Sequence, residues 1–289
     1  MTAFADRSEP PDFVVVGHAV RDVAADGWRL GGTVTFAAVQ AHRLGLSVGV
    51  VTRASVDLDL QAQLPFAQVV QPRSRDTTCF ENTYVDGERH QRVLSRADAI
   101  SPEDIPVGWT DAPIVLLGPV LDELAPDFAA RFGDSSLIGV SAQGWLRRLD
   151  ADGRVRKTSW SGAPFWAECD VLFVSDEDLA EGIDVLDRWT RDVPVVSMTE
   201  SWKGVRMWSA GSWRRMDAFP ESEVDPTGAG DTFATAFLIR MREIGDVDEA
   251  ARFGAAAASL SVGGTGAASI ASRGEVERRL ARHPEVALR

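Results

Sequence analysis

The chain has 289 residues, of which 45% are hydrophobic and 25% are charged, and its formal net charge is −13. This length and composition are typical of one large globular domain, or of a large domain with a small excursion. The acidic balance argues against nucleic acid or an anionic membrane surface as the main partner, because both select basic patches.

The sequence also indicates where the protein works. Its two cysteines, Cys79 and Cys169, lie far apart without the spacing of a metal site, which favours a reduced compartment. Residues 1–12, MTAFADRSEPPD, lack the basic and apolar segments of a secretory signal. No apolar run approaches the roughly 20 residues that span a bilayer. We therefore expect a cytoplasmic protein with neither membrane nor nucleic acid as a partner.

Short, nearly continuous apolar runs recur along the chain and predict buried strands. The first is Phe13–Gly17, and an amphipathic helix between Gly31 and Gly45 follows. Alternating strands and helices of this kind predict an α/β protein whose mostly parallel sheet is covered on both faces. The later strand runs are residues 47–54, 113–120, 136–144, 170–179 and 193–201.

Two segments interrupt this alternation. Thr77–Ser95 alternates polar and apolar residues around Asp86-Gly87, which predicts a hairpin at the edge of the main domain. A second hairpin is predicted at Ala210-Gly211, and the chain from Asp231 onward is predicted to be helical. We expect one domain over residues 1–289, with a β-excursion around residues 77–95.

The stretch VDPTGAGDTFATAF, from Val224 to Phe237, places a glycine turn directly before a helix. A helix N-terminus offers unpaired backbone N–H groups, and glycines let an anion approach them closely. Gly228, Ala229 and Gly230 are therefore candidates for holding a phosphate, with Asp231 as a base that takes a proton from a hydroxyl. The alternative is that Asp231 only caps the helix.

DPTGAGD resembles the C-terminal signature of the ribokinase/PfkB family of carbohydrate kinases, with Pro226-Thr227 in place of the usual Thr-x pair. No Walker A sequence is present. The resemblance implies a ribokinase-like three-layer α/β/α fold in which a small β-lid covers the sugar and often builds a homodimer. It also implies transfer of the γ-phosphate of ATP to a hydroxyl, with Mg²⁺ and, as a further candidate, K⁺.

Other segments extend this resemblance over nearly the whole length. FVVVGHAVRD and GGTVTFAAVQAHRLG are similar to the family's sugar-binding segments, which makes Asp22, Gly31 and Gly32 candidate substrate residues. VSMTESWKGVRMW is similar to the nucleotide-site segment. The candidate nucleotide contacts are Thr199, Ser201, Gly204 and Thr227. SAQGWLR, over Ser141–Arg147, resembles the inositol-kinase-like branch and suggests a cyclic polyol acceptor.

The chain departs from the family pattern at three places. Phe36 stands near the usual asparagine of the N-terminal signature, and Ser201 replaces a glycine of the nucleotide site. The family's N-x-x-E motif appears as residues 175–178, so the resemblance leaves Asp178 and Glu177 as candidate metal anchors. Asp225 resembles a potassium-side carboxylate, with a plain turn residue as the alternative.

Two further function classes stay open at this point. A nucleoside kinase would use the same fold with room for a base, and a regulatory binding protein would keep the fold without turnover. A dinucleotide-binding oxidoreductase is excluded, because GHAVRD has one glycine where that fingerprint needs three. We predict a phosphotransferase whose acceptor is an alcohol group of a sugar or polyol.

Overall fold

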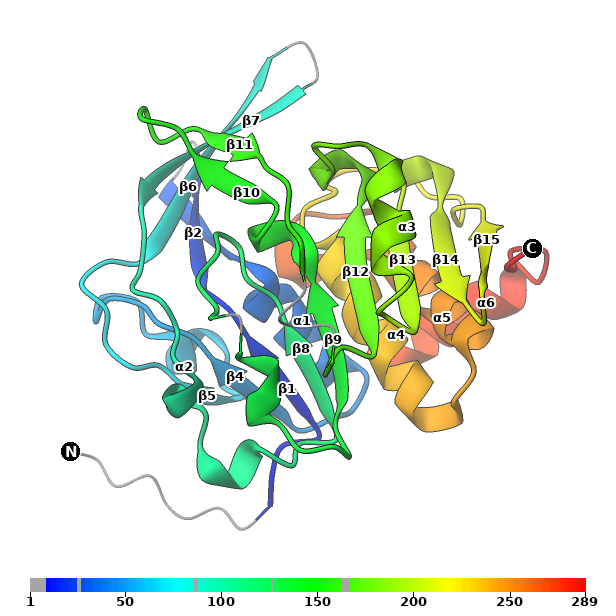
Figure 1. Cartoon of the computed structure of the whole chain (residues 1–289), viewed down its shortest axis with the longest axis horizontal. Helices are drawn as coiled ribbons and strands as arrows, with labels where there is room; N and C mark the ends of the chain where they lie inside the picture. Colours follow the sequence, from blue (N-terminus) through cyan, green and yellow to red (C-terminus); the bar gives the residue numbers. More distant parts are fainter. Residues whose placement is uncertain (1–8, 25–26, 86–87, 126, 163–166) are drawn as a thin grey trace.

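The structure is a computed structural model that describes residues 9–24, 27–85, 88–125, 127–162 and 167–289. A nine-stranded sheet forms its centre (Figure 1). In chain order the strands are β1 (Phe13–Val16), β4 (Val48–Val51), β5 (Gln68–Val70), β8 (Ile114–Leu117), β9 (Leu137–Ser141), β12 (Val171–Ser175), β13 (Val195–Thr199), β14 (Val205–Ser209) and β15 (Ser212–Met216).

The strands follow the spatial order β15-β14-β13-β12-β9-β8-β1-β4-β5. The seven strands from β13 to β5 are parallel, and β14 and β15 add an antiparallel hairpin at one edge. The mostly parallel sheet predicted from the sequence is therefore confirmed, and so is the hairpin at Ala210-Gly211.

Alternate residues of each central strand enter two different cores. In β1, Phe13 and Val15 pack on the helical side, whereas Val14 and Val16 pack on the opposite side. Because both faces are covered, the strand is apolar throughout instead of alternating with polar residues. This double burial explains why the apolar runs in the sequence identify these strands so well.

Four helices lie along one face of the sheet (Figure 1). They are α1 (Thr33–Arg43), α4 (Ala229–Ile244), α5 (Val247–Ser261) and α6 (Arg273–Arg282). Asp246 caps α5 by accepting from the N–H groups of Asp248 and Glu249, and a capping box of Ser272 and Glu275 starts α6. Among the described residues, no helix has the length and apolar character needed to cross a membrane.

The opposite face is covered mainly by loops and short helices, with large buried side chains such as Trp109, Phe128 and Trp189. One of these helices is α3 (Leu186–Trp189), and α2 (Leu60–Gln63) precedes β5. The described 3₁₀ helices are residues 102–104, 107–109, 129–131, 142–144, 176–178, 183–185, 201–203 and 266–269.

A separate four-stranded sheet, with the order β3-β2-β6-β7, lies beside the central one. Its strands are β2 (Val20–Ala24), β3 (Gly27–Gly31), β6 (Thr78–Val85) and β7 (Glu88–Ser95). The hairpin expected at Thr77–Ser95 is present, although its turn at Asp86-Gly87 lies outside the described residues. The excursion is larger than expected, because Val20–Ala24 and Gly27–Gly31 form half of this sheet, to which we refer as the lid sheet.

A further hairpin extends the lid sheet toward the centre of the molecule. It consists of β10 (Arg147–Leu149) and β11 (Val155–Lys157). The N–H of Val93 in β7 donates to the carbonyl of Gly153 in the hairpin turn at 2.8 Å. The β10–β11 hairpin thus joins the lid sheet to the chain that leaves β9.

A buried polar cluster fixes the lid sheet to the end of β1. His18 hydrogen bonds with the Thr78 hydroxyl through Nδ1 at 2.9 Å and with the Asp98 carbonyl through Nε2 at 2.9 Å. Glu123, only 1% exposed, accepts from the backbone N–H groups of His18, Val120 and Leu121 at 2.7 to 3.0 Å. Its two oxygens therefore hold two loops together at the base of the lid sheet.

We predict that Glu123→Gln lowers the free energy of unfolding by about 1–3 kcal/mol, because a glutamine N–H₂ group would face buried N–H donors. Urea unfolding measures the change, with the exposed Glu223→Gln as the control. Equal midpoints for the two variants would contradict the role given to Glu123.

Candidate active site

The predicted glycine turn starts α4. Gly228 is the N-cap residue with a left-handed backbone (φ 78°), and Asp231 is the third residue of the helix. The interpretation of Asp231 as a capping residue is therefore wrong. Its carboxylate is instead available to the surroundings of the first helical turn.

Phe36 explains why the turn needs glycine at position 228. A Cβ atom on Gly228 would overlap the Phe36 ring, which is 3% exposed and belongs to α1. A Cβ on Gly230 would meet no protein atom within 4 Å. Gly228 is thus required by packing and by its positive φ, whereas Gly230 borders open space at the helix N-terminus.

Asp231 is partly buried beside α1 and two other charged groups. Burial raises the pKa of its carboxyl to about 6, while a hydrogen bond with the Thr33 side chain and the charge of Arg147 oppose that shift. The charge of Asp178 raises the pKa further. A carboxyl group with this pKa is mostly ionised at neutral pH yet basic enough to accept a proton.

Arg147, Asp178 and Gln143 form a cluster next to Asp231. Nη2 of Arg147 lies 3.7 Å from Oδ1 of Asp178, and the two side chains are 11% and 12% exposed. The Gln143 amide nitrogen lies 3.4 Å from both Asp178 oxygens. Thr33, Gln143 and Arg147 were not predicted as site residues, although SAQGWLR contains an amide and a guanidinium directly after a strand.

The parallel sheet brings these residues together because all its carboxyl ends lie at one edge. Gln143 follows β9 and Asp178 follows β12. Gly118 follows β8, where a Cβ would overlap the side chain of Thr33. The absence of a side chain at Gly118 lets Thr33 sit at the strand end and reach Asp231.

The predicted substrate residues meet on the lid sheet. Asp22 lies in β2, not in a loop after the first strand, and its carboxylate borders Gly31 closely enough that a Cβ there would overlap it. Nδ2 of Asn82 donates to Asp22 at 3.2 Å, and Nε2 of Gln91 donates to Asn82 at 2.9 Å. These three side chains form a polar row across β2, β6 and β7. Gly32 begins α1 with φ 83°.

Three of the predicted nucleotide residues lie at the end of β13 and in the loop after it, one strand beyond Asp178, whereas the fourth, Thr227, lies in the turn before α4. Thr199 ends the strand, and Gly204 leaves the loop with φ 107°. Ser201 has a positive φ of 52°, so it keeps a left-handed backbone where the family pattern has glycine. Holding a serine in that conformation costs on the order of 1 kcal/mol.

The remaining acidic candidates differ in position. Glu177 is exposed. Asp225 accepts from the N–H groups of Thr227 at 3.0 Å and Gly266 at 3.2 Å, contacts that suit a turn residue. The described part of the chain contains no group of three or more His, Cys, Asp or Glu residues arranged to hold a metal ion. Of the three predicted metal anchors, Asp178 is the one whose charge acts on Asp231.

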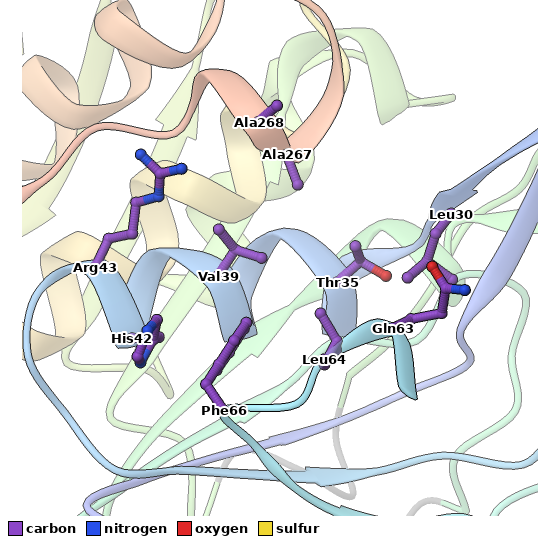
Figure 2. Close-up of a pocket in the computed structure, with 10 residues that line it drawn as sticks. All are labelled: Leu30, Thr35, Val39, His42, Arg43, Gln63, Leu64, Phe66, Ala267 and Ala268. Carbon is purple, nitrogen blue, oxygen red and sulfur yellow. The ribbon is translucent and has the colours of Figure 1, made fainter. Parts of the chain in front are cut away.

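A hollow of about 520 Å³ lies on the outer side of α1 (Figure 2). Its lining includes Val39, Leu64 and His42, whose ring stacks on Phe66 at 4.1 Å. Thr35 also lines it and is about 200° around the helix from Thr33. The hollow is thus separated from Asp231 by the helix, and its lining does not include that residue.

Comparison with known proteins agrees with this architecture. Residues 155–273 match the model of the pfkB family carbohydrate kinase. Inositol 3-kinase of Arabidopsis thaliana is 26% identical over 86% of this chain and 73% of its own length. Cytidine kinase of Thermococcus kodakarensis is 28% identical over 84% and 93%. Ribokinase of Bacillus subtilis is 47% identical, but the match spans only 29% of either chain.

Among solved structures, a pyrophosphate-dependent kinase in the ribokinase family, complexed with a pyrophosphate analogue and myo-inositol, superimposes with a TM-score of 0.76. It is 21% identical and the alignment covers 92% of this chain and 99% of that one. The predicted resemblance to the ribokinase/PfkB family of carbohydrate kinases is confirmed, and the chain has the ribokinase fold. The predicted enzyme class, a phosphotransferase of the PfkB type, is confirmed at that level.

Gly228 and Gly230 give a paired test of the turn. Gly228→Ala is expected to lower the free energy of unfolding by about 1–3 kcal/mol, because it combines a positive φ with overlap on Phe36. Gly230→Ala is expected to be neutral or stabilising by up to about 1 kcal/mol, since alanine favours a helix over glycine. Thermal unfolding compares the two, and a similar loss in both would contradict the packing assigned to Phe36.

Proposed function

We propose that the protein is an ATP-dependent kinase that transfers the γ-phosphoryl group to a hydroxyl of a sugar or polyol, with a cyclic polyol as the favoured acceptor. The observation that carries this proposal is the partly buried Asp231 at the start of α4, with a pKa near 6, beside Thr33, Arg147 and Asp178. The match to the pfkB carbohydrate kinase model supports the reaction class, and the inositol 3-kinase relative supports the acceptor class.

In this mechanism Asp231 accepts the proton of the attacking hydroxyl. Thr33 orients the carboxylate by hydrogen bonding, and Arg147 keeps it ionised by its charge. Phosphoryl transfer needs little covalent help from a protein, so positioning and charge stabilisation supply most of the rate. The position of Asp231 suits an enzyme that holds the carboxylate in contact with the acceptor hydroxyl.

The backbone N–H groups of residues 228–230 would stabilise charge on the transferred group. The Ala229 N–H already lies 3.2 Å from the Pro226 carbonyl, so we assign the larger part of this role to Gly228 and Gly230. The exposed position of Gly230 supports an approach of the donor phosphates from that side.

The nearby carboxylates suit an Mg²⁺ ion that would arrive bound to the ATP phosphates, rather than one held by a dedicated protein site. Mg²⁺ commonly keeps several waters and binds only one or two carboxylates. Asp178 would anchor such waters, with Glu177 further out. When bound, Mg²⁺ neutralises charge on the donor phosphates. For the nucleotide we assign Thr199, Ser201, Gly204 and Thr227. A K⁺ ion beside Asp225 stays a prediction.

The acceptor would lie between Asp231 and the lid sheet. Asp22 and the glycine pair Gly31-Gly32 border it from β2 and from the start of α1. The amide groups of Asn82 and Gln91 continue the polar row that Asp22 begins, which suits an acceptor with several hydroxyls. Assembly as a homodimer through the lid sheet also stays a prediction.

We expect Asp231→Asn to lower turnover by about 10²- to 10⁴-fold, the usual effect of losing a general base. Wild-type turnover should rise with pH through about 6 and level off above it, because Asp231 must be ionised to accept a proton. Initial rates between pH 5 and 8 measure both effects. Asp248→Asn, in the first turn of α5 with its side chain 46% exposed, is the matched control.

The same substitution should raise stability. A carboxyl whose pKa is raised by folding contributes stability at low pH, and that contribution is lost as pH rises from about 4 to about 6. Asp231→Asn should therefore match the wild type near pH 4 and exceed it by about 1–3 kcal/mol at pH 7. A constant difference across this range in urea unfolding would argue against a buried, destabilised carboxylate.

The donor and acceptor are tested together by measuring phosphate ester formation from ATP or pyrophosphate. The acceptor panel contains pentoses, hexoses, inositols and nucleosides. We expect turnover with ATP and an inositol or sugar, and its loss in Asp231→Asn. Turnover with pyrophosphate would correct the donor, and turnover with nucleosides would correct the acceptor. Nucleotide binding without transfer to any acceptor would favour the regulatory alternative.

A further inference from the structure

Glu200 is a buried carboxylate in the loop that we assign to the nucleotide, and the proposed mechanism has not used it. It follows Thr199 and is 6% exposed, whereas the next residues, 201–203, are exposed. A carboxylate is removed from water only where ion pairs and hydrogen bonds compensate for the lost hydration. The groups that compensate Glu200 are therefore a built part of this loop.

Two arginines of the adjacent β14–β15 hairpin (Figure 1) supply this compensation. Arg206 forms a fork with the carboxylate, with Nε 3.1 Å from one oxygen and Nη2 3.0 Å from the other. Nε of Arg215 lies 3.8 Å from a Glu200 oxygen. Arg206 and Arg215 are paired directly across the two strands, where like charges repel, so the carboxylate also offsets their repulsion.

Backbone hydrogen bonds close the loop around the same residue. The Glu200 N–H donates to the Gly204 carbonyl at 2.8 Å, and the Lys203 N–H donates to the Glu200 carbonyl at 3.0 Å. Nη2 of Arg215 donates to the Lys203 carbonyl at 3.3 Å. Arg215 thus contacts both the beginning and the end of the loop, and Glu200 is held by its side chain and its backbone alike.

Ser201 is the residue on which these contacts act. Its φ of 52° is left-handed, a conformation that a Cβ atom makes unfavourable and that glycine adopts freely. A glycine would take this shape without help, whereas a serine needs neighbours that hold it there. Glu200 directly precedes Ser201, and the bonds made by Lys203 and Gly204 follow it. The contacts on both sides supply the restraint that the serine needs.

We propose that Glu200 is a positioning residue for the phosphate donor, because its pairing with Arg206 and Arg215 holds Ser201 in the left-handed conformation of the nucleotide-binding loop. This inference rests on the proposed function, which assigns the loop to the nucleotide. A loop that has the competent shape for only part of the time binds its ligand more weakly in proportion to that fraction. Loss of the Glu200 charge should therefore weaken nucleotide binding and leave the transfer step at Asp231 intact.

The test is a double-mutant cycle of Glu200→Gln and Ser201→Gly, in which calorimetry measures the dissociation constant of ATP with Mg²⁺ and without an acceptor. We expect Glu200→Gln to weaken ATP binding about tenfold by itself, and less than about threefold in the Ser201→Gly background. Glu243→Gln is the matched control, because Glu243 also pairs with two arginines, Arg240 and Arg273. It lies near the C-terminal end of α4, away from the loop.

Steady-state kinetics separate positioning from a general effect on the fold. Glu200→Gln should raise KM for ATP about tenfold and change kcat less than about threefold, because the groups around Asp231 are retained. If Glu200→Gln does not fold, Arg206→Lys carries the test, since it keeps the positive charge but cannot form the fork. It should weaken ATP binding about threefold or more, and by a smaller factor in the Ser201→Gly background.

The outcomes separate this inference from the proposed function. An ATP dissociation constant in Glu200→Gln within about twofold of the wild type overturns the role of Glu200. A loss of equal size with and without Ser201→Gly, or in Glu243→Gln, overturns it as well, since the effect then belongs to the fold in general. A wild-type protein that binds ATP but transfers phosphate to no acceptor overturns the kinase assignment, and the binding cycle still decides the role of Glu200. A wild-type protein that binds no ATP overturns both.

Discussion

The partial burial of the Asp231 carboxylate is the constraint around which the rest of the molecule is arranged. Burial alone would favour the protonated acid, and the surroundings offset it with a helix N-terminus, the Thr33 side chain and Arg147. The resulting group is ionised at neutral pH but not strongly stabilised as an anion. Keeping this carboxylate in a low-dielectric site lowers the free energy of unfolding slightly, as is common for reactive groups in active sites. The large apolar cores on both faces of the sheet supply the stability that makes it tolerable.

The close packing of α1 against α4 positions the glycine turn and Asp231. The Phe36 ring under Gly228 sets the position of the turn, and Thr33, one turn earlier in α1, meets Asp231. The family pattern has a polar residue near position 36, so this chain replaces a polar contact with apolar packing there. The polar row of Asp22, Asn82 and Gln91 on the lid sheet offers hydroxyl-binding groups from the other side. Selection of the acceptor is therefore expected to depend more on the lid sheet than on α1.

The sequence predicts the parts of this fold whose signal is local. Strands buried on both faces appear as apolar runs, and the DPTGAGD turn carries its own motif, so the central sheet, α1, α4 and the turn agree with expectation. β2 and β3 were not predicted, because Val20–Ala24 is polar enough to pass for a loop and becomes a strand only by pairing with β3 and β6. Thr33 and Arg147 were missed for a similar reason. Each lies near Asp231 only because the fold brings together strand ends that are distant in sequence. No local sequence pattern predicts such a contact.

The attachment of the β10–β11 hairpin to β7 also affects how copies of the chain can assemble. An uncovered strand edge presents a row of N–H and C=O groups to any neighbouring chain. On the lid sheet, the β7 side is engaged by the hairpin turn at Gly153, whereas β3 forms the opposite margin with the half-exposed Trp28 on it. Strand addition between two copies would therefore take place at β3. The partner would then lie next to Gly31 and Asp22. A dimer interface formed in this way would border the residues proposed to bind the acceptor.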